Sequence, residues 1–220
     1  MNRSVLVAVI VFGVLLLDQV LKFWIKTNMC LNEAIPVFGD WFYLRFTENK
    51  GMAFGLELGG EYGKLALSVF RIIAVGLIGY YMLTLVNTKV SKSFLACIAL
   101  IFAGAVGNII DSAFYGLIFS ESGNYYHSSH CNPAVFMPAG GGYEGFLHGS
   151  VVDMLHFQVL KGTYPSWVPF YGGSDFEFFR PIFNIADASI SIGVVSLLLF
   201  HRGFFKKHTE AVENEKSAEL

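Results

Sequence analysis

The sequence has 220 residues, of which 54% are hydrophobic and 15% are charged, and its mean hydropathy is +0.54. Soluble domains carry about 25% charged residues, so this composition excludes an ordinary soluble protein and indicates an integral membrane protein of one domain. The formal net charge is −2. The basic pair Lys206–Lys207 directly follows an apolar run, which fits a membrane anchor. We therefore expect no nucleic-acid partner.

Four apolar runs are long enough to cross a bilayer, for which about 20 residues suffice. They lie at about 5–25, 65–86, 94–115 and 182–200. Lys and Arg residues precede the first run, separate the second from the third and follow the fourth, so the positive-inside rule predicts that both termini are cytoplasmic. The connections at about 28–63 and 117–181 then lie outside the cytoplasm. We expect one membrane domain over 1–207 and a polar cytoplasmic tail over 208–220.

Two segments outside the predicted helices have the composition of strands. Residues 41–47 are aromatic and β-prone and precede a predicted turn at 48–51, and residues 151–160 are also strand-like. Gly-rich and aromatic-rich pieces surround the second segment, and Trp167 and Phe170 suit a surface at the membrane interface. The predicted fold is a membrane protein, mainly α, with a small extracytoplasmic β-structure.

The three cysteines show no C-x-x-C spacing. Cys97 lies in an apolar run and is interpreted as a core residue, whereas Cys30 and Cys131 both fall in outer connections, which leaves a disulfide between them open. His127 and His130 precede Cys131 at a ligand-like spacing, but the H-E-x-x-H motif is missing and the segment is Gly-rich and irregular. We expect no metal and no cofactor.

The last apolar run carries polar residues inside the predicted membrane segment. Asn184, Asp187 and Ser191 are spaced i, i+3 and i+7, so they form one polar stripe on a helix. A carboxylate at this depth costs on the order of a few kcal/mol unless it is neutral, paired or hydrated. The sequence therefore predicts that Asp187 belongs to a functional site.

The third run contains G-A-V-G-N-I-I-D over 104–111, in which Asn108 and Asp111 repeat the Asn-x-x-Asp spacing of the fourth run. Gly104 and Gly107 allow a neighbouring helix to approach closely. Two helices thus offer the same pair of polar residues near the same membrane surface. The alternative is a polar clasp between helices with no chemistry.

Two further carboxylates have to be weighed. Asp18 and Lys22 of the first run are spaced i, i+4, and either snorkel to the interface or form a polar contact that supports a site. Asp153 falls on the apolar face of a predicted strand, where desolvation favours its protonated form.

Two carboxylates in a nearly dry site cannot both ionise easily, so one holds a proton while the other acts as a base on water. This is the arrangement of an aspartic protease. Asp187 supplies one member of the predicted pair, and either Asp153 or Asp111 supplies the other.

These motifs together resemble those of bacterial lipoprotein signal peptidase, the signal peptidase II family. The matching segments are D-Q-x-x-K from Asp18, N-K-G-M-A-F from Asn49, G-N-I-I-D from Gly107, V-V-D ending at Asp153 and F-N-I-A-D ending at Asp187. Any one of these motifs is weak, but five in this order over about 170 residues are specific. The resemblance implies a four-helix inner-membrane aspartic endopeptidase with a small extracytoplasmic β-cradle.

The resemblance also implies roles for single residues. Asp153 and Asp187 would be the catalytic pair, and the choice of Asp153 over Asp111 rests on the family rather than on spacing. The residues that would bind substrate or support the pair are Asp18, Lys22, Asn49, Gly51, Asn108, Asp111 and Asn184.

The implied substrates are diacylglyceryl-modified prolipoproteins, cut just before the lipidated cysteine near the outer face of the bacterial cytoplasmic membrane. Membrane lipids and globomycin-like peptide inhibitors are the other implied ligands, and we expect a monomer. Two features depart from the family pattern. Ser112 stands where the family usually has Arg, which removes a bidentate donor. The segments 112–152 and 161–180 are longer than usual and are expected to elaborate the cradle or to cover a lipid-entry cleft.

The competing interpretation is a small proton-coupled transporter that uses intramembrane Asp and Asn residues as a relay. Against it, the polar residues gather towards one membrane face, and the sequence has no visible inverted repeat. A structural membrane subunit would leave the paired Asn-x-x-Asp stripes unexplained.

Overall fold

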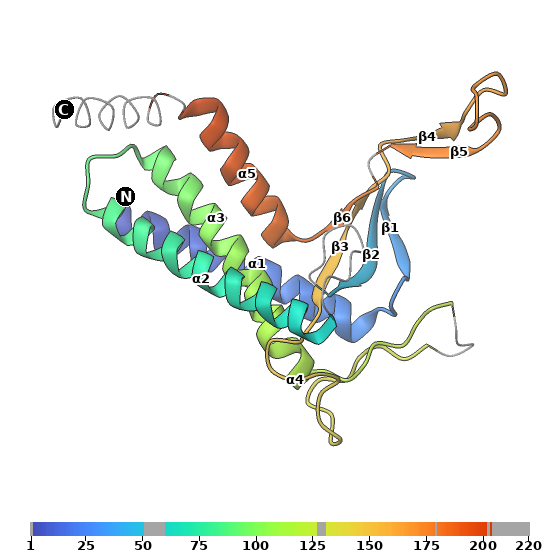
Figure 1. The fold of residues 1–220 in the computed structure, drawn as a ribbon, viewed down its shortest axis with the longest axis horizontal. Coiled ribbons are helices and arrows are strands. Elements are labelled where there is room, and N and C mark those ends of the chain that lie inside the picture. The colour runs from blue at the N-terminus through green and yellow to red at the C-terminus, as the bar shows by residue number, and fades with distance from the viewer. Residues whose placement is uncertain (1, 51–59, 127–130, 179, 202, 204–220) are drawn as a thin grey trace.

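The computed structural model describes residues 2–50, 60–126, 131–178, 180–201 and 203 (Figure 1). The predictions for Gly51, for His127 and His130 and for the polar tail therefore lie outside the described residues.

The described part of the chain contains four long helices (Figure 1): α1 (Arg3–Asn28), α2 (Gly60–Val86), α3 (Lys92–Ile110) and α5 (Ile185–Phe200). A π-helical turn, η1 (Asp111–Tyr115), and the short α4 (Gly116–Ile118) extend α3. Three apolar stretches are long enough to cross a membrane: Arg3–Asn28, Gly63–Val86 and Lys92–Ile118. The fourth, α5, has 16 residues and begins at Ile185, three residues later than the predicted run, because residues 182–183 pair as a strand. A mainly helical membrane protein is confirmed, and four spans stay a prediction.

The outer surface of the helices is apolar. Large side chains such as Phe12, Phe70, Leu77 and Phe200 point away from the protein. An apolar surface of this extent is costly in water and is expected of helices that face lipid. A cluster of buried residues that includes Leu95 holds the helices together inside.

Helix α3 is the central helix and packs against α1, α2 and α5. The approach of α5 depends on two glycines of α3. A Cβ on Gly107 would lie 2.9 Å from Asp18 Oδ2 and 3.2 Å from Ala186 Cβ, and a Cβ on Gly104 would overlap the carbonyl oxygen of Ala186. The prediction that Gly104 and Gly107 permit close helix packing is confirmed, and it brings the polar residues of α3 against the start of α5.

The start of α1, the connection between α2 and α3 and the end of α5 lie at one end of the molecule (Figure 1). Arg3 donates to the carbonyl of Val90 over 2.7 Å, and the Ser93 hydroxyl lies 3.2 Å from His201 Nε2. The sheet lies at the opposite end (Figure 1). Arg3 and the connection that carries Lys89 therefore share one end of the described structure, and the orientation of this end in a membrane stays a prediction.

A four-stranded antiparallel sheet covers the other end, in the order β1 (Ala34–Phe38), β2 (Phe42–Asn49), β3 (Val151–Phe157) and β6 (Ile182–Phe183). Strand β2 continues through Glu48 and Asn49, which pair with Val152 and Val151. The predicted turn at 48–51 is therefore wrong for its first two residues, since they belong to the ladder with β3.

Strand β6 positions the start of α5. Leu155 of β3 pairs with Phe183, and the next residue, Asn184, is the N-cap of α5. The chain therefore passes directly from the sheet into the membrane helix. This connection brings Asp153 of β3 next to the first turn of α5.

A separate hairpin of β4 (Leu160–Thr163) and β5 (Asp175–Phe178) projects from the sheet (Figure 1). It occupies most of the long segment 161–180. Trp167 and Phe170, in the turn of the hairpin, are exposed. The predicted strand 151–160 is accordingly divided, because β3 ends at Phe157 and Leu160 begins the hairpin.

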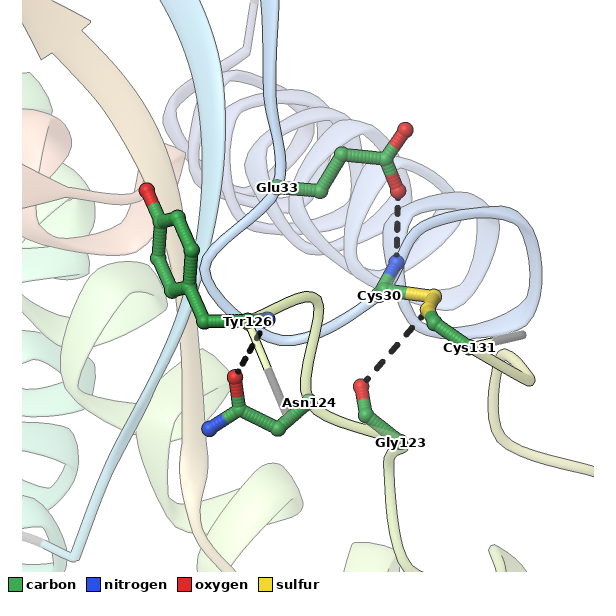
Figure 2. Close-up of a disulfide and its surroundings, with 6 residues drawn as sticks. All are labelled: Cys30, Glu33, Gly123, Asn124, Tyr126 and Cys131. Carbon is green, nitrogen blue, oxygen red and sulfur yellow. Dashed lines mark hydrogen bonds between the residues drawn. A yellow bond between two sulfur atoms is a disulfide. The ribbon is translucent and has the colours of Figure 1, made fainter. Parts of the chain in front are cut away.

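A disulfide joins Cys30, just after α1, to Cys131, with the two Cα atoms 6.2 Å apart (Figure 2). Beside it, Leu31 N–H donates to Gly123 O over 2.9 Å, and Tyr125 N–H donates to Leu31 O over 3.0 Å. The disulfide that the sequence left open is thus present, and it links the long connection between α4 and β3 to the end of α1.

Candidate active site

Asp187 lies in the first turn of α5 and is held from two sides. Its carboxylate accepts a hydrogen bond from Asn108 Nδ2 over 2.8 Å. Its backbone N–H donates to Asn184 Oδ1 over 2.8 Å, which is the side-chain cap of the helix. A negative charge is favourable at this position because the N-terminus of a helix carries a partial positive charge.

Asp153 faces the same network from the sheet. Only 5% of the residue is exposed, and its Oδ1 accepts from Asn184 Nδ2 over 2.7 Å. Asn49, from the end of β2, also hydrogen-bonds to it. Asn184 thus donates to the carboxyl group of Asp153 through its amide and accepts from the backbone N–H of Asp187 through its carbonyl oxygen, so it links the strand residue to the start of α5.

The environment of Asp153 favours its protonated form. Burial and the nearby charge of Asp187 raise the pKa of this carboxyl group to about 7, against the opposing effects of Lys22 and of the hydrogen bonds from Asn184 and Asn49. Near neutral pH the carboxyl group of Asp153 can therefore hold a proton. The sequence predicted that desolvation favours this form of Asp153, and the catalytic pairing with Asp187 stays a prediction.

A buried cation lies behind the pair. Lys22 Nζ is 2.8 Å from Asp18 Oδ2 and 2.8 Å from Asp111 Oδ2, and these three side chains are fully buried. Lys22 also donates to Asn108 Oδ1 over 3.1 Å. That bond leaves the Nδ2 group of Asn108 to face Asp187. The interpretation of Asp18 and Lys22 as a snorkelling pair is wrong, because α1 continues to Asn28 and buries both.

The two carboxylates beside Lys22 connect the helices to each other and to the sheet. Asp18 Oδ1 accepts from the backbone N–H of Ala186 over 2.9 Å, which satisfies a free donor at the start of α5. Asp111 Oδ2 accepts from Val152 N–H over 3.2 Å, one residue before Asp153. Gln19 donates to the other oxygen of Asp111 over 2.9 Å. Asp111 therefore holds α3 against β3, whereas Asp153 faces Asn184.

Sequence reasoning missed a second buried polar cluster. Lys26 is fully buried, forms an ion pair with Glu48 and donates to Ser122 Oγ over 3.0 Å. Its ammonium group also lies 4.7 Å from the ring centroid of Tyr143. Glu48 directly precedes Asn49, so this cluster fixes the strand end that reaches Asp153. The sequence did carry a signal for this cluster: Lys26 follows Lys22 at the same spacing of four residues at which Lys22 follows Asp18, so all three lie on one helix face.

Ser112 occupies the position where the sequence departs from the family pattern. Its hydroxyl donates to the carbonyl of Asn108 over 3.1 Å, inside its own helix. Its carbonyl oxygen accepts from Gly149 N–H over 2.9 Å. Ser112 therefore helps to anchor the connection between α4 and β3 on η1. Its side chain lies on the helix backbone and leaves the carboxyl pair to other donors.

A cavity of about 260 Å³ reaches Asp187 from between the membrane helices. Asn108, Asp187 and Arg71 line it, together with the apolar residues Phe70, Ala74, Val75, Ile78, Ala105 and Ile190. The site therefore combines a polar end with an apolar wall at membrane depth. Within the described ranges, the structure has no group of three His, Cys, Asp or Glu side chains placed to hold a metal ion.

The fold and the site define a mainly helical membrane protein in which an antiparallel sheet and the helices bring carboxyl and amide groups together. The chain belongs to the signal peptidase II family, whose model matches residues 10–202. It is 49% identical over 194 residues to a lipoprotein signal peptidase of Porphyromonas gingivalis, covering 88% of this chain and 81% of that protein. It is 37% identical over 209 residues to one of Amoebophilus asiaticus, covering 92% and 81%.

Solved structures share the fold. A bacterial membrane enzyme solved by the in meso method at 2.3 Å resolution superposes with a TM-score of 0.55 at 22% identity, covering 93% of this chain and 90% of the other. A second, solved at 1.9 Å resolution, gives a TM-score of 0.53 at 23% identity, covering 88% and 90%. At this level of identity the likeness concerns the fold alone.

Proposed function

We propose that this protein removes signal peptides from diacylglyceryl-modified prolipoproteins, cutting before the lipidated cysteine, and that Asp153 and Asp187 activate the attacking water. The observation that carries the proposal is that Asn184 and Asn108, which hydrogen-bond to each other, donate to Asp153 and to Asp187 respectively, and that the pKa of the Asp153 carboxyl group is raised to about 7. The lipoprotein signal peptidases of similar sequence support the substrate class.

In the proposed reaction, ionised Asp187 is the base and protonated Asp153 is the acid. Asp187 takes a proton from water as the water oxygen bonds to the scissile carbonyl carbon, and Asp153 gives its proton to the carbonyl oxygen. When the carbon–nitrogen bond breaks, Asp187 returns its proton to the leaving nitrogen. A hydroxyl of the intermediate returns a proton to Asp153, so the pair ends in its starting state.

The other groups of the site hold this pair in place. Asn108 and Asn184 donate to the carboxylates, and Lys22 keeps Asn108 oriented so that its Nδ2 group faces Asp187. Fixed donors of this kind stabilise charge without reorganising during the reaction. Asn49 and Gly51 follow each other closely in the chain, and we propose both as substrate contacts.

We further propose that the sheet lies at the outer face of the bacterial cytoplasmic membrane, with both termini inside. The shared end of Arg3, Lys89 and Lys92 supports this orientation through the positive-inside rule. Membrane lipids would then bound the cavity, and globomycin-like peptides would inhibit from it. We propose that a monomer is sufficient.

A gel-shift assay with purified protein and a diacylglyceryl-modified prolipoprotein tests the function. At equal folded amounts, Asp153→Asn and Asp187→Asn are expected to lose at least about 100-fold in rate, as for loss of a general acid or base. Asp111→Asn should keep partial activity. Asp40→Asn, in the exposed turn between β1 and β2, is the matched control and should cleave like the wild type.

Three outcomes would contradict parts of the proposal. An inactive Asp111→Asn beside an active Asp153→Asn would leave a protease with a different pair. Cleavage that persists in Asp187→Asn would remove the two-aspartate mechanism. A folded wild type that leaves a verified lipidated substrate uncut would overturn the function, and pH-dependent flux across vesicles would then favour the transporter.

A further inference from the structure

Arg71 of α2 lines the cavity that reaches Asp187. Four other residues of α2 line the same cavity: Phe70, Ala74, Val75 and Ile78. Ala74, Val75 and Ile78 lie three, four and seven residues after Arg71, which places them on the same helix face as Arg71, and Phe70 lies beside it. Arg71 is therefore the charged member of an otherwise apolar face, and it lies where that face meets the polar end of the cavity.

An arginine in a membrane helix is costly and is generally retained for a partner or a function. Arg71 is only partly buried, and the charge of Asp187 attracts its guanidinium group. Helices α2 and α5 both pack against α3, and the cavity lies between them. Arg71 and Asp187 thus line the same cavity from α2 and from α5.

The charged groups around Asp187 come from several elements. Asp153 lies on β3, and the charge of Asp187 is among the causes that raise the pKa of the Asp153 carboxyl group. Lys22 of α1 acts through Asn108, and Asp18 and Asp111 already offset its charge. Among these described groups, Arg71 is therefore the cation whose charge is directed at Asp187 from across the cavity.

We propose that Arg71 is a positioning residue of the catalytic pair, whose guanidinium keeps the Asp187 carboxylate ionised and directed into the cavity. This makes Asp187 rather than Asp153 the base. The inference rests on the proposed two-aspartate reaction.

The test compares Arg71→Met, which has similar length without the charge, with Arg71→Lys, which keeps the charge. The profile of kcat/KM against pH is measured with a lipidated prolipoprotein. In Arg71→Met the acidic limb of the profile should shift to higher pH by about one unit, since a nearby opposite charge lowers the pKa of a carboxyl group by at least about one unit. At a fixed pH on that limb, kcat/KM should therefore fall about tenfold. Arg71→Lys should retain most of the wild-type limb.

Arg180→Met is the matched control, since it removes an exposed arginine near the sheet and leaves α2 intact. Its acidic limb should coincide with that of the wild type. If the acidic limb of the kcat/KM profile of Arg71→Met coincides with that of the wild type, the proposal is overturned. A raised KM would then show that Arg71 binds substrate. Unchanged kinetics with a lower melting temperature would show that its role is structural.

An infrared measurement separates this inference from the proposed function, because it needs no cleavage. The carbonyl band of protonated Asp187, assigned by its loss in Asp187→Asn, is followed as the pH is lowered. In Arg71→Met the band should appear at higher pH than in the wild type, and Arg71→Lys should resemble the wild type. Identical titrations in all three would sink the proposal even if the enzyme cleaves its substrate.

Discussion

The amide of Asn184 donates to Asp153 over 2.7 Å, so the residue that begins a membrane helix also holds a carboxyl group of the sheet. The same side chain accepts from the backbone N–H of Asp187. Helix capping and the geometry of the proposed catalytic pair therefore depend on one residue. Changes at this position can separate the two roles, because the cap needs an acceptor while Asp153 needs a donor.

Asn184→Ser should keep the cap and lose the contact with Asp153. A serine hydroxyl is a good N-cap acceptor but is too short to reach the sheet. We expect prolipoprotein cleavage to fall at least about tenfold, the equivalent of about 1.4 kcal/mol, because the Asp153 carboxyl group loses its donor, and we expect the melting temperature to fall less than in Asn184→Ala because the cap is kept. Asn184→Ala should lose both roles and a further ~1 kcal/mol of stability.

Ser91→Ala is the matched control for this comparison. Ser91 caps α3 at the other end of the molecule, where it accepts from Phe94 N–H over 3.2 Å. Its loss should lower the melting temperature and leave cleavage unchanged. If Asn184→Ser cleaves at the wild-type rate, the bridge to Asp153 has no part in the reaction.

Lys22→Met should destabilise the protein strongly. It leaves Asp18 and Asp111 buried side by side without a cation, and breaking a buried ion pair costs about 3–5 kcal/mol. The measurement is the melting temperature in one detergent. A variant that combines Lys22→Met with Asp18→Asn and Asp111→Asn should recover much of the loss, because no unpaired charge remains. Equal melting of Lys22→Met and the wild type would show that the pairs do not matter.

The sequence predicted those features that follow from local spacing. Apolar runs identify helices, and an aspartate inside such a run is too costly to be incidental, which singles out Asp187 and Asp111. Gly104 and Gly107 indicated close packing because only small residues permit it. The contact between Asn108 and Asp187 needed the register of two helices, which spacing alone does not supply.

Other features depended on tertiary pairing. The two-residue strand before Asn184 exists because Leu155 and His156 pair with it. From the sequence alone, two apolar residues that precede an apolar helix are indistinguishable from its first residues. Lys26 and Arg71 resembled ordinary charged residues near the ends or along the faces of helices. Their partners come from β2, from the segment at Ser122 and from α5, which the chain order does not place nearby.

Removing the disulfide between Cys30 and Cys131 should destabilise the protein. Cys30→Ser combined with Cys131→Ser opens a link between residues 101 positions apart, and loss of a native disulfide typically costs about 2–5 kcal/mol. We expect a lower melting temperature, and the same decrease when the wild type is reduced. Cys97→Ala, in the buried helix core, should stay as sensitive to reductant as the wild type. A wild type whose melting is unaffected by reduction would contradict this prediction.

Cleavage should fall as the pH rises through about 7, since the proposed acid, Asp153, has its pKa raised to about that value by burial and by the charge of Asp187. Above this pH the proton that must be given to the scissile carbonyl is lost. The measurement is kcat/KM from pH 5 to 9 with a lipidated substrate, with Asp40→Asn as the control. A rate that stays constant to pH 9 would exclude Asp153 as the acid.

The same group should make stability depend on pH. The folded pKa of Asp153, about 7, lies above its unfolded value, so between about 4 and 7 the folded state holds a proton that the unfolded state has released. The stabilisation is therefore present in full below about pH 4 and is lost as the pH rises through 7. Each pKa unit corresponds to about 1.4 kcal/mol, so the loss is a few kcal/mol. Asp153→Asn cannot release a proton, so its melting temperature should fall less between pH 5 and pH 8 than that of the wild type. Parallel decreases in both proteins would place the ionisation elsewhere.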